Sequence, residues 1–191
     1  MKIGLFPGSF NPIHIGHLLL ATYMKEQANF DEVWFIVSPQ NPLKDVKILA
    51  QEEHRYKMVE MAIYQHPYFK VSDIEFHLPK PSYTVNTLDE LKKEFKQHTF
   101  SLILGEDNLE NLHKWKNYEE IILNNHIYIY NRKTAHDYKN KWQHPHFHYI
   151  ELPFLDISST EIRSRIKGQL VIKYMVNEAV EKYINEHHLY Q

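Results

Sequence analysis

The chain has 191 residues, a formal net charge of −2 and no cysteine. The length suits one domain with a full-sized core, and the lack of cysteine excludes disulfides, zinc–thiolate sites and thiol nucleophiles. With no basic excess, no signal peptide and no run of roughly 18 apolar residues, we expect a cytoplasmic protein with no nucleic acid or membrane partner.

Short apolar runs alternate with amphipathic patterns along the chain. The apolar runs predict strands over residues 2–6, 32–37, 69–74, 99–104, 126–130 and 147–152. Helical spacing predicts helices around residues 20–28, 51–65, 85–95, 158–167 and 177–187. This alternation is typical of an α/β fold with a Rossmann-like, doubly wound parallel sheet, which binds ligands at the carboxyl ends of its strands. We expect residues 1–191 to form a single domain, with the helices from about residue 158 packed on it.

The first predicted strand leads into Gly8-Ser9-Phe10-Asn11-Pro12-Ile13-His14-Ile15-Gly16-His17. Gly8 would let the backbone turn sharply and approach a ligand closely. His14 and His17 are three residues apart, so on a first helical turn both imidazoles project the same way. Gly16 between them would leave room for a flat group. Two surface histidines beside a capping loop are the alternative, but this combination at a strand end favours a phosphate site at a helix start.

This segment resembles the His-x-Gly-His signature of the nucleotidyltransferase superfamily, whose sheet is Rossmann-like. The full run is similar to the opening of bacterial nicotinate-nucleotide adenylyltransferases, although that family more often has Asp where Asn11 stands. The resemblance implies that Asn11 lies near a mononucleotide. It implies ATP contacts for six residues of the run, namely Gly8, Ser9, Phe10, His14, Gly16 and His17.

A second loop, Ser38–Lys44, follows the second predicted strand and carries one cation to the same edge of the sheet. An isolated lysine is usually only solvated. The loop resembles the family's proline-rich loop ending in a phosphate-contacting lysine, which implies that role for Lys44. Arg55 and Met58 in the next helix also match the family's spacing, and we interpret both as structural.

The segment Ser82–Leu88 opens the third predicted helix, and its Thr84 is a candidate N-cap. The segment resembles the family's Ser-Tyr-Thr-x-Asp-Thr-Leu, with Asn86 in place of Asp. The resemblance implies that Tyr83 and Thr84 contact the mononucleotide.

The fourth predicted strand ends in Gly105, with Asp107 two residues later. A glycine and then an aspartate at a strand end suit a ribose, and Trp115 offers a face for a pyridine ring, although a lone tryptophan is more often core. The pattern Gly-x-Asp-x-Leu-x-x-Leu-x-x-Trp resembles the family. It implies that Gly105 and Asp107 lie near the ATP ribose, with Trp115 and Arg132 on the mononucleotide side.

Near the end of the chain, Ser158 and Glu161 form a capping-box pattern at a helix start. The hydroxyls that follow and an arginine one turn later could hold a triphosphate. The run Ile157–Arg163 resembles the superfamily's second signature, Ile-Ser-Ser-Thr-x-Ile-Arg. The ATP contacts that it implies are Ser158, Ser159, Thr160 and Arg163.

Adenylyl transfer to a phosphate needs no activated nucleophile, because the acceptor is already anionic. It needs positioning and positive charge around the α-phosphate and the leaving pyrophosphate, which we assign to His14, His17, Lys44 and Arg163. Mg²⁺ would be carried by the ATP phosphates, without a protein metal site. The resemblance, which runs from about residue 2 to 185, implies transfer of AMP from ATP to nicotinate mononucleotide, giving deamido-NAD and pyrophosphate.

Two alternatives remain at this point. A pantetheine-phosphate adenylyltransferase would share His-x-Gly-His but would not be expected to carry the Gly-x-Asp to Trp pattern. A non-catalytic nucleotide-binding regulator would have little reason to keep all four cationic residues. His144, His146 and His148 could share a strand face and bind a metal, but no nearby carboxylate completes such a site. The preference for nicotinate or nicotinamide and the oligomeric state are open.

Overall fold

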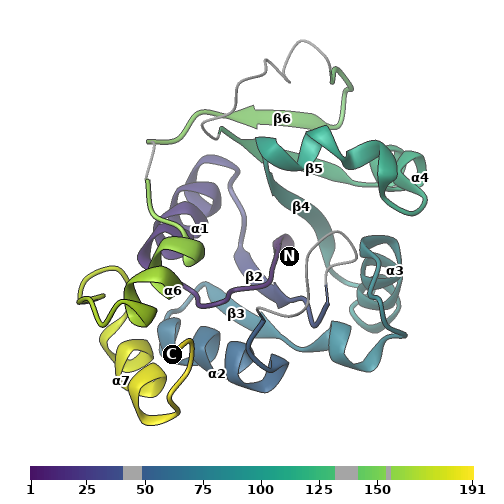
Figure 1. Ribbon diagram of the computed structural model, residues 1–191. Helices are drawn as coiled ribbons and strands as arrows, with labels where there is room; N and C mark the ends of the chain where they lie inside the picture. The colour runs from purple at the N-terminus through teal and green to yellow at the C-terminus, as the bar shows by residue number, and fades with distance from the viewer. Residues whose placement is uncertain (41–48, 132–141, 154–155) are drawn as a thin grey trace.

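The computed structural model describes residues 1–40, 49–131, 142–153 and 156–191. Its strands form one parallel sheet in the order β3-β2-β1-β4-β5-β6 (Figure 1). The strands are β1 Lys2–Gly8, β2 Glu32–Val37, β3 Phe69–Ser72, β4 Thr99–Gly105, β5 His126–Tyr130 and β6 Phe147–Ile150. The chain moves outward from β1 to β3 and then returns to place β4 on the other side of β1. The strand order therefore reverses between β1 and β4.

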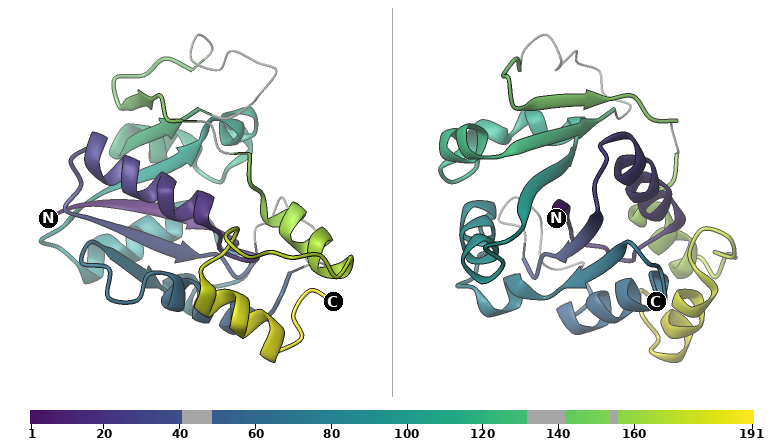
Figure 2. Two further views of the ribbon diagram at one scale, coloured as in Figure 1. Left: turned by 90° about the vertical axis from the view of Figure 1, so that its left-hand side faces the viewer. Right: turned by 180° about the vertical axis from the view of Figure 1, so that it is seen from behind.

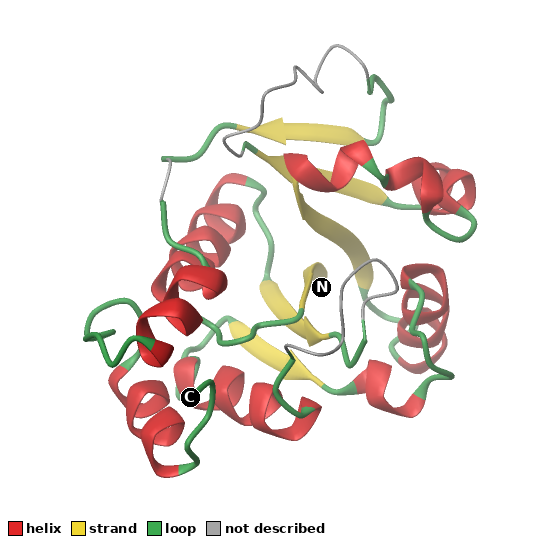
Figure 3. Cartoon of the chain, viewed as in Figure 1, coloured by secondary structure: helices red, strands yellow, loops and turns green. Residues whose placement is uncertain are grey.

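Helices cover both faces of this sheet (Figures 2 and 3). One face carries α1 Ile15–Gln27, α2 Glu52–Ala62, α6 Ser159–Lys167 and α7 Glu178–Glu186, and the other carries α3 Thr84–Glu94 and α4 Tyr118–Asn124. Three short 3₁₀ helices complete the described elements, namely η2 Ile74–His77, η3 Glu106–Glu110 and η4 Leu112–Lys114. The predicted Rossmann-like α/β fold is confirmed.

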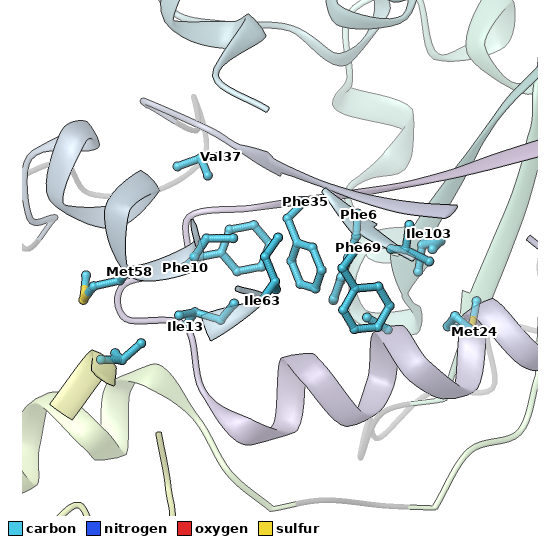
Figure 4. Packing of buried hydrophobic residues seen from close by; sticks show 14 of the residues in the cluster. Phe6, Phe10, Ile13, Met24, Phe35, Val37, Met58, Ile63, Phe69 and Ile103 are labelled. Carbon is cyan, nitrogen blue, oxygen red and sulfur yellow. The ribbon is translucent and has the colours of Figure 1, made fainter. Parts of the chain in front are cut away.

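The two faces of the sheet bury separate apolar clusters, because successive strand residues point to opposite sides. Phe6 and Phe35 face α1, whereas their neighbours Leu5 and Trp34 face α3. On the α1 side, Phe10 returns from the loop after β1 and packs on Phe35, with ring centroids 5.5 Å apart (Figure 4). The loop that follows β1 is thus fixed by the core itself.

The C-terminal helices share the core of the sheet on the α1 side. Val180 and Ile184 of α7 are buried in the same cluster as Met58 and Val59 of α2. Beyond α7, the hydroxyl of Tyr190 is buried, and burial raises the pKa of this phenol although Arg55 and Arg163 oppose the shift. Tyr190 therefore lies near Arg163, which lines the cleft described below, and near Arg55, which holds the adjacent loops.

Most sequence-predicted elements lie within two or three residues of the observed bounds, with two local corrections. The strand predicted to reach residue 74 ends at Ser72, because Ile74 already opens η2. Thr84 is not the N-cap of α3. That position belongs to Tyr83, whose extended backbone places its carbonyl to accept hydrogen bonds from the N–H groups of Asn86 and Thr87. Among the described residues, no helix is both long and apolar enough to cross a bilayer.

A histidine cluster lies at the amino-terminal edge of the sheet, where β5 and β6 begin. His126 Nδ1 and His148 Nε2 are 2.9 Å apart, and His146 Nδ1 is 2.9 Å from the carbonyl oxygen of Ile122. His144 Nδ1 instead accepts a hydrogen bond from the His146 N–H. The three alternating histidines thus have separate partners. In the described ranges, no three His, Cys, Asp or Glu side chains are placed to hold a metal ion.

This cluster predicts a loss of stability in mild acid. Burial, the other imidazoles and Lys2 lower the pKa of both His126 and His148. The unfolded chain then binds protons more readily than the folded one, so stability is present above the usual histidine pKa of about 6.5 and falls as the pH drops below it. We expect the thermal midpoint of His148→Gln to fall less than that of the wild type between pH 7.5 and 5.5. The effect will be modest because His126 is exposed and solvent screens its interaction with His148.

The matched control is His113→Gln, because His113 is exposed and lies away from the cluster. Its midpoint should follow the wild-type pH dependence. Equal pH dependence in all three proteins would contradict the assignment of the acid sensitivity to the pair of His126 and His148.

Candidate active site

A cleft of about 630 Å³ opens where β1 and β4 end. Its volume is within the range of about 300–1,000 Å³ that small-molecule sites occupy. It lies at the point where the strand order reverses, which is the expected ligand position in an open α/β sheet. Most of the sequence-predicted site residues line it, namely Gly8, Ser9, Phe10, Asn11, His14, His17, Tyr83, Thr84, Gly105, Asp107, Trp115, Ser158, Ser159, Thr160 and Arg163.

The tight turn after β1 depends on Phe10 more than on Gly8. Phe10 has a φ of 45°, in the left-handed region that a bulky side chain rarely adopts. Gly8 has no positive φ; a Cβ there would lie 2.8 Å from the Phe10 ring. The glycine therefore makes room for the ring that anchors the loop in the core, and our explanation of Gly8 by its own turn geometry was wrong.

The two histidines of the first signature lie together, as their spacing predicts. Their ring centroids are 3.7 Å apart at the start of α1. His17 Nδ1 accepts a hydrogen bond from the backbone N–H of His14, at 3.2 Å. Because Nδ1 is the acceptor, the proton of the neutral ring is on Nε2. His17 can therefore present an N–H donor to a ligand in the cleft.

Gly16 does not line the cleft. A Cβ at this position would lie 3.0 Å from Nδ1 of His14 and 3.6 Å from Ile157. The missing side chain leaves space for the imidazole of His14, which is only 6% exposed. Gly16 thus supports the cleft by accommodating His14, and the space beside it is taken by that imidazole.

Helix α6 joins the late signature to the first one. The Ser159 hydroxyl donates to the Pro12 carbonyl at 2.9 Å, and Arg163 Nη1 donates to the Asn11 carbonyl at 2.8 Å. At the helix start, Ser158 Oγ accepts from the N–H of Glu161 at 3.1 Å, as the capping pattern predicts. Residues about 150 positions apart in the chain thus share one wall of the cleft.

Arg55 holds the loops behind this wall. Its side chain is buried, and its guanidinium donates to four carbonyl oxygens at 2.6–2.9 Å, those of Ser9, Ser38, Pro39 and Ala50. Burial lowers the pKa of this guanidinium. These contacts support the interpretation of Arg55 as a structural residue. It connects the loop after β1 to the loop after β2 by hydrogen bonds.

The far end of the cleft is formed by the start of α3 and the segment after η4. Tyr83 and Thr84 line it from one side and Trp115 from the other. Sequence reasoning missed three charged residues here, Glu75, Lys114 and Lys116. Their only sequence signal is position, since Glu75 precedes the Ser-Tyr-Thr motif and the lysines flank the tryptophan.

Glu75 is buried, and both of its carboxylate oxygens are engaged. Ser82 Oγ donates to one at 2.8 Å, and Thr87 Oγ1 donates to the other at 2.9 Å. These bonds fasten η2 to the first turn of α3 and so fix the backbone on either side of Tyr83. Lys44 and Arg132, both predicted to contact substrate, lie outside the described residues.

A cleft at the strand switch point, lined by two helix N-termini, two adjacent histidine rings and an arginine, defines a nucleotidyltransferase site. A family model described as cytidylyltransferase-like matches residues 5–165. Proteins named probable nicotinate-nucleotide adenylyltransferase are similar to the whole chain. That of Flavobacterium psychrophilum is 47% identical and that of Bacillus pumilus 38%, each over 100% of this chain and at least 98% of the relative.

A solved structure shares the fold. The Plasmodium falciparum nicotinic acid mononucleotide adenylyltransferase in complex with NaAD superimposes with a TM-score of 0.84, at 24% identity over 99% of this chain and 97% of that one. The chain belongs to the nicotinate-nucleotide adenylyltransferases of the cytidylyltransferase-like family. It is accordingly an enzyme of NAD biosynthesis.

Proposed function

We propose that this cleft joins the AMP of ATP to the phosphate of nicotinate mononucleotide, giving deamido-NAD and pyrophosphate. The observation that carries the proposal is the shared wall formed by His14, His17 and Arg163, which line one cleft although they come from opposite ends of the chain. Such a wall can stabilise charge that develops on a phosphate during transfer.

The triphosphate lies, in this proposal, between the starts of α1 and α6. Both helix starts present backbone N–H groups and positive dipole ends, which attract phosphate. His17 donates from Nε2, and Arg163 adds a fixed positive charge because its guanidinium is held by the Asn11 carbonyl and the Thr160 hydroxyl. Lys44 would contribute a further cation. None of these groups becomes covalently attached, because the acceptor phosphate is itself the nucleophile.

The two nucleosides occupy opposite ends of the cleft. Gly105 and Asp107 follow β4 and would hold the ATP ribose, since a carboxylate accepts hydrogen bonds from both ribose hydroxyls. The pyridine ring of the mononucleotide would stack on Trp115 beside Tyr83 and Thr84. Asn11 and Arg132 would complete the mononucleotide site.

Mg²⁺ fits this cleft as a companion of the ATP phosphates. The described lining contains two carboxylates, those of Glu75 and Asp107. The two oxygens of Glu75 already accept hydrogen bonds from the hydroxyls of Ser82 and Thr87. A cage of protein ligands is thus not available in the described lining, whereas Mg²⁺ commonly relies on substrate phosphates and its own waters. When bound, the ion neutralises phosphate charge.

An assay of pyrophosphate release tests the proposal. The purified chain is incubated with ATP and Mg²⁺, together with nicotinate mononucleotide or phosphopantetheine. We expect pyrophosphate and deamido-NAD with the first acceptor, none with the second, and loss of the activity on addition of EDTA. Release only with phosphopantetheine would overturn the acceptor assignment, and release with neither would favour a nucleotide-binding regulator.

We further propose that the chain forms one cooperative domain in the cytoplasm. The shared burial of Val180 and Ile184 with Met58 supports a common core for the C-terminal helices. The cytoplasmic location stays a prediction from the sequence.

A further inference from the structure

A lysine and two aromatic rings meet at the mononucleotide end of the cleft. Lys116 lines the cleft directly after Trp115 in the chain, and its Nζ is 4.9 Å from the ring centroid of Tyr83. An ammonium over an aromatic face is attracted by the negative face of the ring. The attraction restricts the long lysine side chain and holds its charge over the Tyr83 ring, in the cleft that Trp115 also lines.

The other charges at this end leave Lys116 available to a ligand. Glu75 is buried with one hydroxyl donor on each oxygen, and Lys114 donates to Asn111 Oδ1 at 2.8 Å. Within the part of the chain that the structure describes, Lys116 forms no ion pair with a carboxylate. Its charge is therefore not neutralised by a carboxylate of the described residues.

Nicotinate and nicotinamide mononucleotides differ in a single ring substituent. One carries a carboxylate and the other a neutral carboxamide, so the two can be distinguished by charge. Resting on the adenylyl-transfer function proposed above, we propose that Lys116 is a specificity-determining residue. Its ammonium, held over Tyr83 beside Trp115, selects the mononucleotide whose pyridine ring carries an anionic substituent.

The proposal predicts a change in substrate preference. The Lys116→Met variant keeps the length and apolar stem of the side chain but removes the charge. We expect kcat/KM for nicotinate mononucleotide to fall about tenfold, as for loss of a hydrogen bond to a charged group. The value for nicotinamide mononucleotide and the KM for ATP should stay within about twofold, so the preference ratio falls about tenfold. Lys116→Arg, which keeps the charge, should preserve most of the preference.

Lys114→Met is the matched control, because it removes a neighbouring charge of the same cleft. This variant should keep the wild-type preference ratio. The proposal is overturned if Lys116→Met keeps that ratio, or if it slows both mononucleotides equally, which would indicate general attraction of phosphate. Wild-type enzyme that is inactive with both mononucleotides would overturn the proposed function itself, whereas an active wild type with an unchanged variant ratio overturns only the role of Lys116.

Discussion

Replacement of His17 by alanine should lower kcat by about 10²–10³-fold, the loss seen when one donor to a developing oxyanion is removed. The expectation rests on the hydrogen bond from the His14 N–H to His17 Nδ1, which puts the ring proton on Nε2, and on the place of His17 in the cleft lining. Single-turnover measurement of deamido-NAD formation gives the rate of the chemical step. A kcat within tenfold of the wild type would contradict this role.

Two further substitutions separate catalysis from folding at this position. In His17→Asn, the amide oxygen can take the place of Nδ1 and keep the hydrogen bond to the His14 backbone, but no donor replaces Nε2. We expect the thermal midpoint of His17→Asn to stay near the wild-type value, while its kcat falls as far as that of His17→Ala. In His17→Gln, the longer side chain can place an N–H near the position of Nε2 and should recover part of the rate.

Replacement of Arg55 by methionine should destabilise the enzyme by at least about 3 kcal/mol. The substitution removes the arginine donor from the half-buried carbonyls of Ser9 and Ser38 and from the buried carbonyl of Pro39. A buried group left without a partner costs about 1–3 kcal/mol. The loss is a large fraction of the typical stability of about 5–15 kcal/mol. Urea unfolding at pH 7.5 gives the free energy of unfolding.

Lys57→Met provides the control on the same helix, because Lys57 is exposed and pairs with Glu60 at the surface. It should change the free energy of unfolding by less than about 0.5 kcal/mol. Arg55→Lys should be intermediate, since one ammonium cannot reproduce the planar fork that reaches several carbonyls. If Arg55→Met were as stable as Lys57→Met, the two loops would have to be held by other contacts.

The convergence of the two signatures was predictable from the sequence, because the carboxyl ends of parallel strands meet at one edge of the sheet. Apolar runs such as Glu32–Val37 indicate buried strands, and the strand–helix alternation limits the topology. Helix α4 was missed, since its seven residues are too few for a clear period of 3.6. The cleft's outline thus follows from local patterns and a general rule on parallel sheets.

The supporting contacts were not predictable, because they depend on tertiary geometry. No local sequence pattern shows that Arg163 donates a hydrogen bond to the Asn11 carbonyl, or that Glu75 accepts hydrogen bonds from two hydroxyls. The burial of Arg55 has a weak sequence signal, since it lies three and four residues before the buried Met58 and Val59 and so shares their helix face. The role of Lys116 has no sequence signal beyond its place beside Trp115, because an isolated lysine is ordinarily solvated.

The link between α6 and the loop after β1 also has a consequence during protein synthesis. Ser159 and Arg163 donate hydrogen bonds to the carbonyls of Pro12 and Asn11. A ribosome-bound chain shorter than about 165 residues therefore lacks the part of the cleft wall that α6 supplies. Fragments that stop before α6 should therefore bind no triphosphate productively and transfer no AMP, even where the loop after β1 has already formed.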